Sequence, residues 1–103
     1  MAARAVAKAY LDRLPAWDRQ RAAQLAEQHA IELTDARFEL LQAARAFYDR
    51  YGFSPSNRPL ISTIAERLGL EKGRSIYLQS QFPDSPAKTV ALLAGLPKPK
   101  NCL

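Results

Sequence analysis

The segment that most constrains the fold is residues 35–51, where apolar side chains recur at intervals of three and four residues. This apolar face consists of Phe38, Leu41, Ala44, Tyr48 and Tyr51, widened by Leu40 and Phe47. Thr34 precedes the segment as an N-cap, and Gly52 follows it at a position that favours positive φ. Because this is the longest periodic segment of the chain, we expect it to form the central helix of the fold.

Four shorter helices are predicted around this segment. A helix is predicted from Trp17 to about residue 28. Trp17 is expected to lie in its first turn and to anchor the packing of this helix on the core. Pro59 is placed at N1 of a helix over residues 60–68. A fourth helix is predicted over 74–81 and a fifth over 86–94.

The caps and faces of the last two helices are predicted as well. Ile76, Tyr77 and Leu78 are expected to face inward from the fourth helix. Ser85 is expected to cap the fifth helix, with Pro86 at its first position.

The amino-terminal residues are ambiguous. Residues 1–9 are rich in alanine and suit a helix, whereas residues 10–14 suit either a short strand or a turn. We therefore predict a single domain, residues 1–103, of the mostly helical α+β class. It comprises a short β or irregular segment (1–15), about five helices in an orthogonal array (16–94) and a mobile carboxy-terminal arm (95–103).

Composition excludes several classes of protein. No apolar run approaches the roughly 18 residues that span a bilayer, and the start of the chain has no secretory h-region. The single cysteine cannot form an internal disulfide, which favours a reducing cytoplasm. His29 is the only histidine and has no cysteine nearby, so neither a metal site nor another cofactor is expected.

The formal net charge is +5, and from residue 72 onward five basic residues stand against one acidic residue. Such an excess suits an acidic protein or a nucleic acid, although a solvated surface has the same composition. The helices at 60–68 and 74–81 have helix-turn-helix dimensions, with Arg74, Ser75 and Gln79 as the groove-facing residues. Lys72, Arg74 and Lys88 are therefore candidate contacts for nucleic acid or a protein partner.

The carboxy-terminal arm carries the one cysteine, Cys102, next to the last residue. Pro97 and Pro99 favour an extended, polyproline-like backbone, and Lys98 and Lys100 make it basic. Cations beside a thiol lower its pKa and so increase its nucleophilicity. This arrangement predicts a reactive thiol on a stiff tether that reaches into another protein.

One further cation is a candidate for supporting the thiolate. Arg58, in the loop before the third helix, is placed to meet the arm if the arm folds back, although a solvent-exposed loop charge or a contact with a helix end is the simpler interpretation.

The arm, Gly95-Leu96-Pro97-Lys98-Pro99 with Cys102 next to the end, resembles the DsrC/TusE family of sulfur-carrier proteins. The resemblance extends over nearly the whole chain and includes further matching residues. These are Tyr10-Leu11, Trp17, Leu33-Thr34-Asp35-Ala36, Phe47-Tyr48, Ser54-Pro55, Arg58, Leu60, Glu71-Lys72-Gly73, Ser75, Tyr77-Leu78, Phe82-Pro83 and Pro86-Ala87-Lys88.

The resemblance implies a mostly helical domain preceded by a small β-meander, and a persulfide carried on Cys102. In the TusE branch the donor is a heteromeric sulfurtransferase, and the acceptor is the enzyme that 2-thiolates the wobble uridine of certain tRNAs. The carrier then meets tRNA only indirectly and needs no membrane. It belongs with the sulfurtransferases, whether or not it is counted as an enzyme in its own right.

Three departures from the family pattern bear on function. The DsrC branch, which serves dissimilatory sulfite reductase, uses a second cysteine where this chain has Ala91. His-Trp is frequent in the family where Arg37-Phe38 stands here, and a basic residue is common at the positions of Ser62 and Leu92. The missing second thiol favours relay to another protein. A single-cysteine protein of dissimilatory sulfur metabolism and a helix-turn-helix regulator remain the alternatives.

Overall fold

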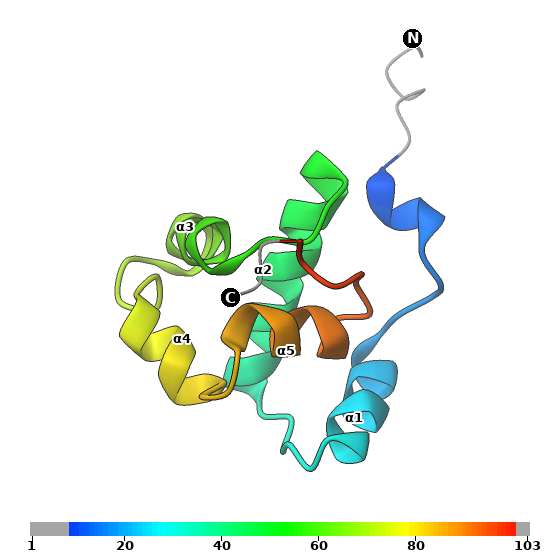
Figure 1. Ribbon diagram of the computed structural model, residues 1–103, viewed down its shortest axis with the longest axis horizontal. Coiled ribbons are helices and arrows are strands. Elements are labelled where there is room, and N and C mark those ends of the chain that lie inside the picture. Colours follow the sequence, from blue (N-terminus) through cyan, green and yellow to red (C-terminus); the bar gives the residue numbers. More distant parts are fainter. Residues whose placement is uncertain (1–8, 101–103) are drawn as a thin grey trace, which may run out of the picture.

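A computed structural model describes residues 9–100 of the chain. Its elements are a 3₁₀ helix and five α-helices, in the order η2 (Tyr10–Arg13), α1 (Arg19–Gln28), α2 (Asp35–Tyr51), α3 (Asn57–Leu68), α4 (Ser75–Gln81) and α5 (Pro86–Leu93). Helix α2 packs against η2, α3 and α5, and α5 in turn contacts α1, α3 and α4 (Figure 1). The prediction that residues 35–51 form the central helix is confirmed.

The apolar face of α2 forms much of the core. Leu40, Leu41 and Ala44 are completely buried, and Tyr48 is nearly so. Tyr51 departs from the prediction because its side chain is 48% exposed at the carboxy-terminal end of the helix. There it packs on the ring of Phe47, with the ring centroids 4.6 Å apart.

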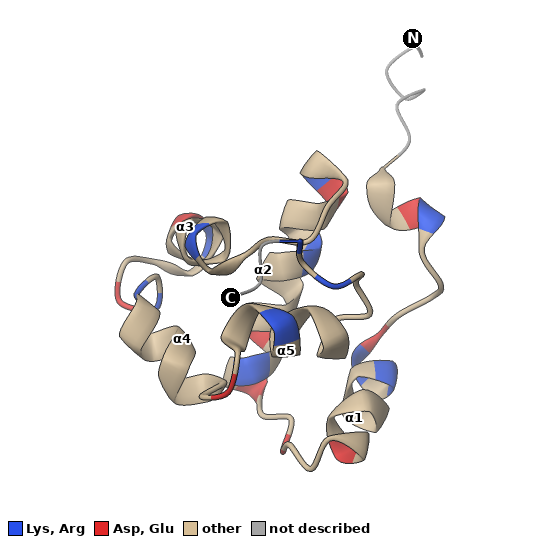
Figure 2. Ribbon diagram, in the orientation of Figure 1, with Lys and Arg blue, Asp and Glu red and all other residues tan. Residues whose placement is uncertain are grey.

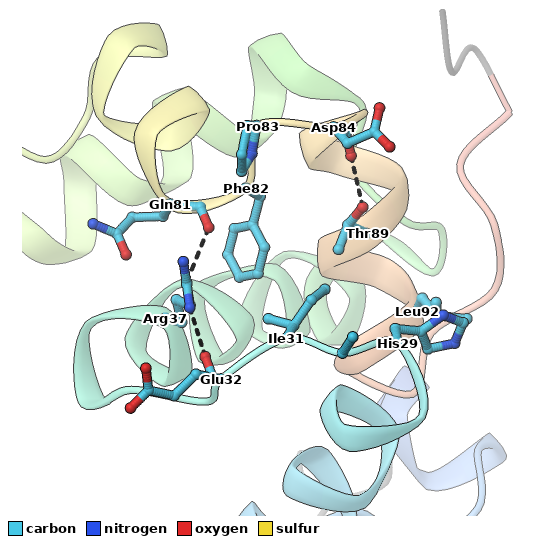
Figure 3. A pocket seen from close by; sticks show the side chains of 11 residues that line it. His29, Ile31, Glu32, Arg37, Gln81, Phe82, Pro83, Asp84, Thr89 and Leu92 are labelled. Carbon is cyan, nitrogen blue, oxygen red and sulfur yellow. Dashed lines mark hydrogen bonds between the residues drawn. The ribbon is translucent and has the colours of Figure 1, made fainter.

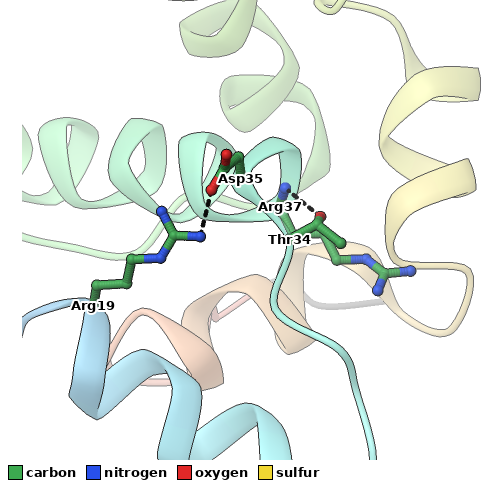
Figure 4. Close-up of polar contacts among 4 residues, drawn as sticks. All are labelled: Arg19, Thr34, Asp35 and Arg37. Atoms are coloured by element: carbon green, nitrogen blue, oxygen red, sulfur yellow. Dashed lines mark hydrogen bonds and ion pairs between the residues drawn. The ribbon is translucent and has the colours of Figure 1, made fainter.

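Both ends of α2 are capped as predicted. The Thr34 hydroxyl accepts a hydrogen bond from the Arg37 backbone amide at 3.1 Å. Asp35, in the first turn, pairs with Arg19 of α1 at 2.5 Å (Figure 4). At the other end Gly52 adopts φ +80°, and a Cβ there would lie 2.7 Å from the Tyr10 ring. Gly52 is therefore required both for its backbone conformation and for the packing of η2.

Three helices begin at residues other than those predicted, and the smallest difference is in α4, which begins at Ser75 and not at Arg74. Helix α1 begins at Arg19, because the Asp18 carboxylate accepts from the Arg21 amide at 2.8 Å, so Trp17 precedes the helix instead of forming its first turn. Helix α3 begins at Asn57, which places Pro59 at its third position. Proline is tolerated there because amides of the first turn have no partner within the helix.

The predicted amino-terminal β element is wrong for the described residues, since no strand occurs in residues 9–100. Residues 10–13 form η2 instead, and the Leu11 amide donates to the Asp49 carboxylate of α2 at 3.1 Å. A single strand leaves its backbone amides and carbonyls without hydrogen-bond partners unless a second strand lies beside it. A 3₁₀ helix forms backbone hydrogen bonds within itself, so few of its backbone groups need partners elsewhere in the chain. Residues 1–8 lie outside the described part of the chain.

Helix α5 is capped by a residue that the sequence did not indicate. Ser85 occupies the predicted N-cap position and Pro86 the first turn, but the Ser85 hydroxyl makes no capping bond and its φ is +51°. The Asn57 side chain of α3 accepts from the Ala87 amide at 3.0 Å instead. This bond ties the start of α5 to the start of α3.

The inward prediction for Ile76 is wrong. Leu78 is buried and Tyr77 is half-buried, but Ile76 is 74% exposed. A seven-residue helix presents little more than one narrow face to the core, and Leu78 occupies it.

Among the described residues, no helix is long and apolar enough to cross a membrane.

Candidate functional site

The arm leaves α5 through a tight reversal of the chain. The Gly95 amide donates to Leu92 O at 3.3 Å, and the Leu96 amide donates to Ala91 O at 2.9 Å. Gly95 itself has φ +69°. This pair of bonds around a left-handed glycine is the Schellman motif, which turns the chain back along the helix it has just left.

Two side chains from distant parts of the sequence bind the last carbonyls of α5. The Trp17 indole donates to Leu93 O at 3.0 Å, and the Arg45 guanidinium donates to Ala94 O at 2.7 Å. The guanidinium carbon also lies 4.4 Å from the Trp17 ring centroid, within range of a cation–π interaction. A cation is favourable here because the helix dipole is negative at this end.

Two features of its surroundings act on the charge of Arg45 in opposite directions. Burial lowers the pKa of Arg45 from its ordinary value, while the nearby Asp49 carboxylate acts in the opposite direction. Arginine remains protonated despite such a shift, so its hydrogen bond to the end of α5 persists.

Gly95 lies directly against the indole. A Cβ at this position would be 2.9 Å from Trp17 Cδ1, closer than side chains normally pack, and 3.5 Å from the Arg45 guanidinium. Glycine is thus required twice at residue 95, by its backbone angle and by the tryptophan.

Beyond Gly95, the described part of the arm runs back over the domain toward the loop between α2 and α3 (Figure 1). Leu96 and Pro99 are buried, and the buried Ser54 hydroxyl of that loop donates to Pro97 O. Pro97, Lys98 and Lys100 face solvent. Cys102 lies outside the described residues, so its role and the mobility of the arm stay predictions.

The other predicted site residues lie on separate elements. Arg58 is exposed in the first turn of α3, and within residues 9–100 no hydrogen bond or ion pair joins it to the arm. Arg74 is exposed at the N-cap position of α4. Lys88 is exposed on α5, so the three do not form one cluster.

Lys72 is already engaged within the chain. It donates to the Glu39 carboxylate of α2 at 2.8 Å, and this hydrogen bond raises the pKa of Lys72.

The two helices of the predicted helix-turn-helix pair are α3 and α4, which contact each other, and Ser75 lies exposed on the second of them. The Gln79 amide, however, donates to Pro83 O at 2.8 Å and is used inside the chain. Within the described range, no three His, Cys, Asp or Glu side chains come together in a group that could hold a metal ion.

Sequence reasoning missed the roles of Trp17, Arg45 and Ser54. Two of them, Trp17 and Ser54, belong to the residues that carry the family resemblance, which is the one signal that could have singled them out. Arg45 carried no such signal, because an arginine in the middle of an amphipathic helix is indistinguishable from a solvated charge.

The fold and the site define a class of protein: a small helical domain that holds the base of a cysteine-bearing carboxy-terminal arm. The chain belongs to the DsrC-like family, because the family model described as DsrC like protein matches residues 2–103. This confirms the resemblance seen in the sequence.

Individual relatives agree with this assignment. A sulfurtransferase TusE homolog of Haemophilus influenzae is 47% identical over 91% of this chain and 86% of its own. Sulfurtransferase TusE of Yersinia pestis is 42% identical over 94% and 89%. The solution structure of Allochromatium vinosum DsrC has a TM-score of 0.75 and 39% identity, covering 85% of this chain and 79% of its own.

Proposed function

We propose that this chain is a sulfur-relay protein that accepts sulfane sulfur as a persulfide on Cys102 and passes it to an acceptor enzyme. The observation that carries the proposal is the anchored base of the arm. Three side chains, those of Trp17, Arg45 and Ser54, hold residues 93–97, so the chain end that bears the only thiol starts from a defined place on the domain. Lys98 and Lys100 stand exposed just before that thiol.

The chemistry is a thiolate exchange that needs no external oxidant. The Cys102 thiolate attacks the outer sulfur of a donor protein's persulfide, a new S–S bond forms, and the donor's S–S bond breaks to release its thiolate. The outer sulfur arrives on Cys102 with its proton, if it carries one. Transfer to the acceptor repeats the exchange in the same sense, so no electrons are gained or lost overall.

The position of Ala91 favours relay over internal disulfide chemistry. This residue is 1% exposed in the core of the domain, and its carbonyl accepts from the Leu96 amide at the turn into the arm. With a methyl group at the position where the DsrC branch has its second cysteine, Cys102 must complete its reaction on another protein.

We assign the relay to 2-thiouridine synthesis in tRNA, in the cytoplasm. The donor is then a heteromeric sulfurtransferase and the acceptor a tRNA 2-thiouridylase. Support comes from the relatives named TusE, which reach 47% identity, against 39% for Allochromatium vinosum DsrC. That second likeness makes dissimilatory sulfur metabolism the alternative. Loss of 2-thiouridine from tRNA when the gene is deleted supports the assignment, whereas unchanged tRNA supports the alternative.

Intact-mass spectrometry tests the relay itself. The chain is incubated with a cysteine desulfurase, cysteine and the heteromeric donor, and is expected to gain one sulfur atom. Cys102→Ser removes the acceptor and must abolish the gain. A wild-type chain that gains no sulfur, or a Cys102→Ser chain that still gains it, would refute the proposal.

A further inference from the structure

A groove runs along the outer face of α5 and ends at the arm. It consists of two adjoining hollows of about 440 and 370 Å³, which share His29, Asp84, Thr89 and Leu92. Figure 3 shows the first hollow, where the Arg37 guanidinium lies between the carbonyls of Glu32 and Gln81 and donates to both. The second hollow extends from Lys88 of α5 to Leu96 and Lys98 of the arm. We call the two hollows together the α5 groove.

The groove exposes an apolar side chain where the packing of α5 does not require one. Leu92 is 42% exposed, whereas its neighbours Val90 and Leu93 are completely buried on the opposite face of the helix. Exposed leucine is unremarkable alone, but here it stands in a hollow flanked by charged residues, as in the centre of a protein interface.

The backbone around the groove is also unusual. Within residues 9–100, the two non-glycine residues with positive φ are Ala30 at +57° and Ser85 at +51°. Both line the groove, one in each hollow. Ala30 takes this conformation as the left-handed residue that ends α1, where the Ile31 amide donates to Ala26 O at 2.9 Å, so these backbone angles shape the walls of the groove and do not by themselves indicate a binding site.

The position of the groove relative to the thiol limits what can cover it. Cys102 follows Lys98 by four positions, so four Cα–Cα steps join the two residues and their Cα atoms are at most about 14 Å apart. A typical protein interface covers about 800 Å² per partner, a patch of roughly 16 Å radius. A partner that exchanges sulfur with Cys102 therefore also reaches the arm end of the α5 groove.

The charges at this end of the groove are mainly positive. Lys88 and Lys98 both line the second hollow and are exposed, and across residues 9–100 neither forms an ion pair. Of the residues that the structure describes, Asp84 is the one that brings a carboxylate to this hollow. Figure 2 shows these basic positions as blue bands on α5 and on the carboxy-terminal segment. The complementary surface is acidic.

We propose that the α5 groove is the docking surface for the donor sulfurtransferase, which presents a carboxylate to Lys88 and Lys98 and an apolar side chain to Leu92. This inference rests on the proposed sulfur relay and adds to it the surface by which the partner is recognised. Docking brings the two sulfur atoms together, and the arm then has only a short distance to cover.

The test separates docking from chemistry by using two sulfur sources. Inorganic polysulfide loads Cys102 without a protein partner, whereas the purified heteromeric donor, charged by a cysteine desulfurase, must dock first. Lys88→Glu and Leu92→Ala are each expected to raise the KM for the donor protein about tenfold, with kcat and polysulfide loading unchanged.

Two matched variants serve as controls. Arg67→Glu makes the same charge reversal on an exposed residue of α3, and Leu70→Ala makes the same truncation at a leucine that is 77% exposed. Neither residue lines the α5 groove, and neither change should alter the KM. Thermal melting establishes that all four variants are folded.

Each other outcome overturns the inference at an identifiable point. A wild-type chain that takes sulfur from neither source overturns the relay, and docking with it. Sulfur uptake with an unchanged KM in both groove variants overturns docking alone. If Leu92→Ala alters the rate at which iodoacetamide alkylates Cys102 without any partner, the chain's own end occupies the groove. Self-association of the wild-type chain that Leu92→Ala abolishes would assign the groove to a second copy.

Discussion

Gly95→Ala is the substitution that most directly tests how the arm is anchored. Alanine in the left-handed conformation at φ +69° is destabilised by about 1 kcal/mol relative to glycine. Its Cβ would also lie 2.9 Å from Trp17 Cδ1, so the indole must move. Moving it weakens the hydrogen bond to Leu93 O, worth about 1 kcal/mol, and the cation–π contact with Arg45, worth about 0.5–1 kcal/mol. We therefore expect Gly95→Ala to lower the free energy of unfolding by about 3 kcal/mol.

Urea denaturation measures this loss. Trp17 is the only tryptophan, so its fluorescence follows the anchored region while circular dichroism follows the helices. With an m-value of about 1.5 kcal/mol per M, the midpoint should fall by about 2 M in both signals. Coincident transitions would also establish that the arm base and the helices unfold together.

Two companion variants divide the effect into its causes. Gly95→Asn tolerates the left-handed backbone but keeps a Cβ, so it should still lose about 2 kcal/mol through the indole. Gly69→Ala, where no atom lies within 4 Å of the added Cβ, measures backbone strain without a clash, in an extended positive-φ conformation (φ +103°, ψ +162°) that is less favourable for alanine than the left-handed one and so gives an upper bound. If Gly95→Asn stays within about 0.5 kcal/mol of wild type, the contact with Trp17 does not restrict residue 95 and the reasoning is refuted.

Three other contacts give equally direct expectations. Ser54→Ala should cost about 1 kcal/mol and speed hydrogen exchange of the arm amides, whereas Ser56→Ala, whose hydroxyl makes no capping bond, should change neither. If the arm amides exchange at the same rate in the two variants, the Ser54 hydroxyl does not hold the arm. Arg45→Lys should lose about 1 kcal/mol in thermal melts because an ammonium cannot stack on the indole as a planar guanidinium does; full stability would dismiss the stacking. Asn57→Ala should lower the free energy of unfolding by about 1 kcal/mol, because it removes the hydrogen bond to the Ala87 amide. Ser85→Gly should leave stability unchanged or increase it, because glycine favours φ +51°. If Ser85→Gly is the more destabilising variant, Ser85 and not Asn57 caps α5.

Local patterns in the sequence were enough to predict most of the helices. The period of residues 35–51, with Thr34 before and Gly52 after, identified the central helix and both its ends. These patterns lie within a few residues of the helix or helix end that they determine, so a single sequence is enough to predict it. The end of the last helix is equally local, because Gly95 follows an apolar run and is itself followed by Leu96 and Pro97.

What the sequence did not reveal was decided by partners distant along the chain. Ser85 looked like the cap of α5, but the amide of Ala87 is taken by Asn57, thirty residues earlier. Residues 10–14 suited either a strand or a turn, and the contact that holds them as η2 is with the Asp49 carboxylate on α2. Ile76 shared a pattern with Leu78, and the choice between them depended on where the core lies.

The candidate site likewise has one part that could be predicted from the sequence and one part that could not. The arm, its glycine and its basic residues were visible as a motif. The groups that hold it come from the segment before α1, from the middle of α2 and from the loop after α2. No local pattern links these three positions, because what they share is only their proximity to the end of α5.

The bond from Trp17 to Leu93 O spans 76 residues of a chain of 103. We expect this contact to form late in folding, because the loop that it closes includes most of the domain and loop closure has an entropic cost. During synthesis Leu93 is made long after Trp17, so the indole has no carbonyl to bind until α5 has been made. A chain that stops short of α5, or one that has misplaced its first helix, cannot hold the arm in position. Completion of the fold and readiness of its last residues to meet a partner are therefore one event.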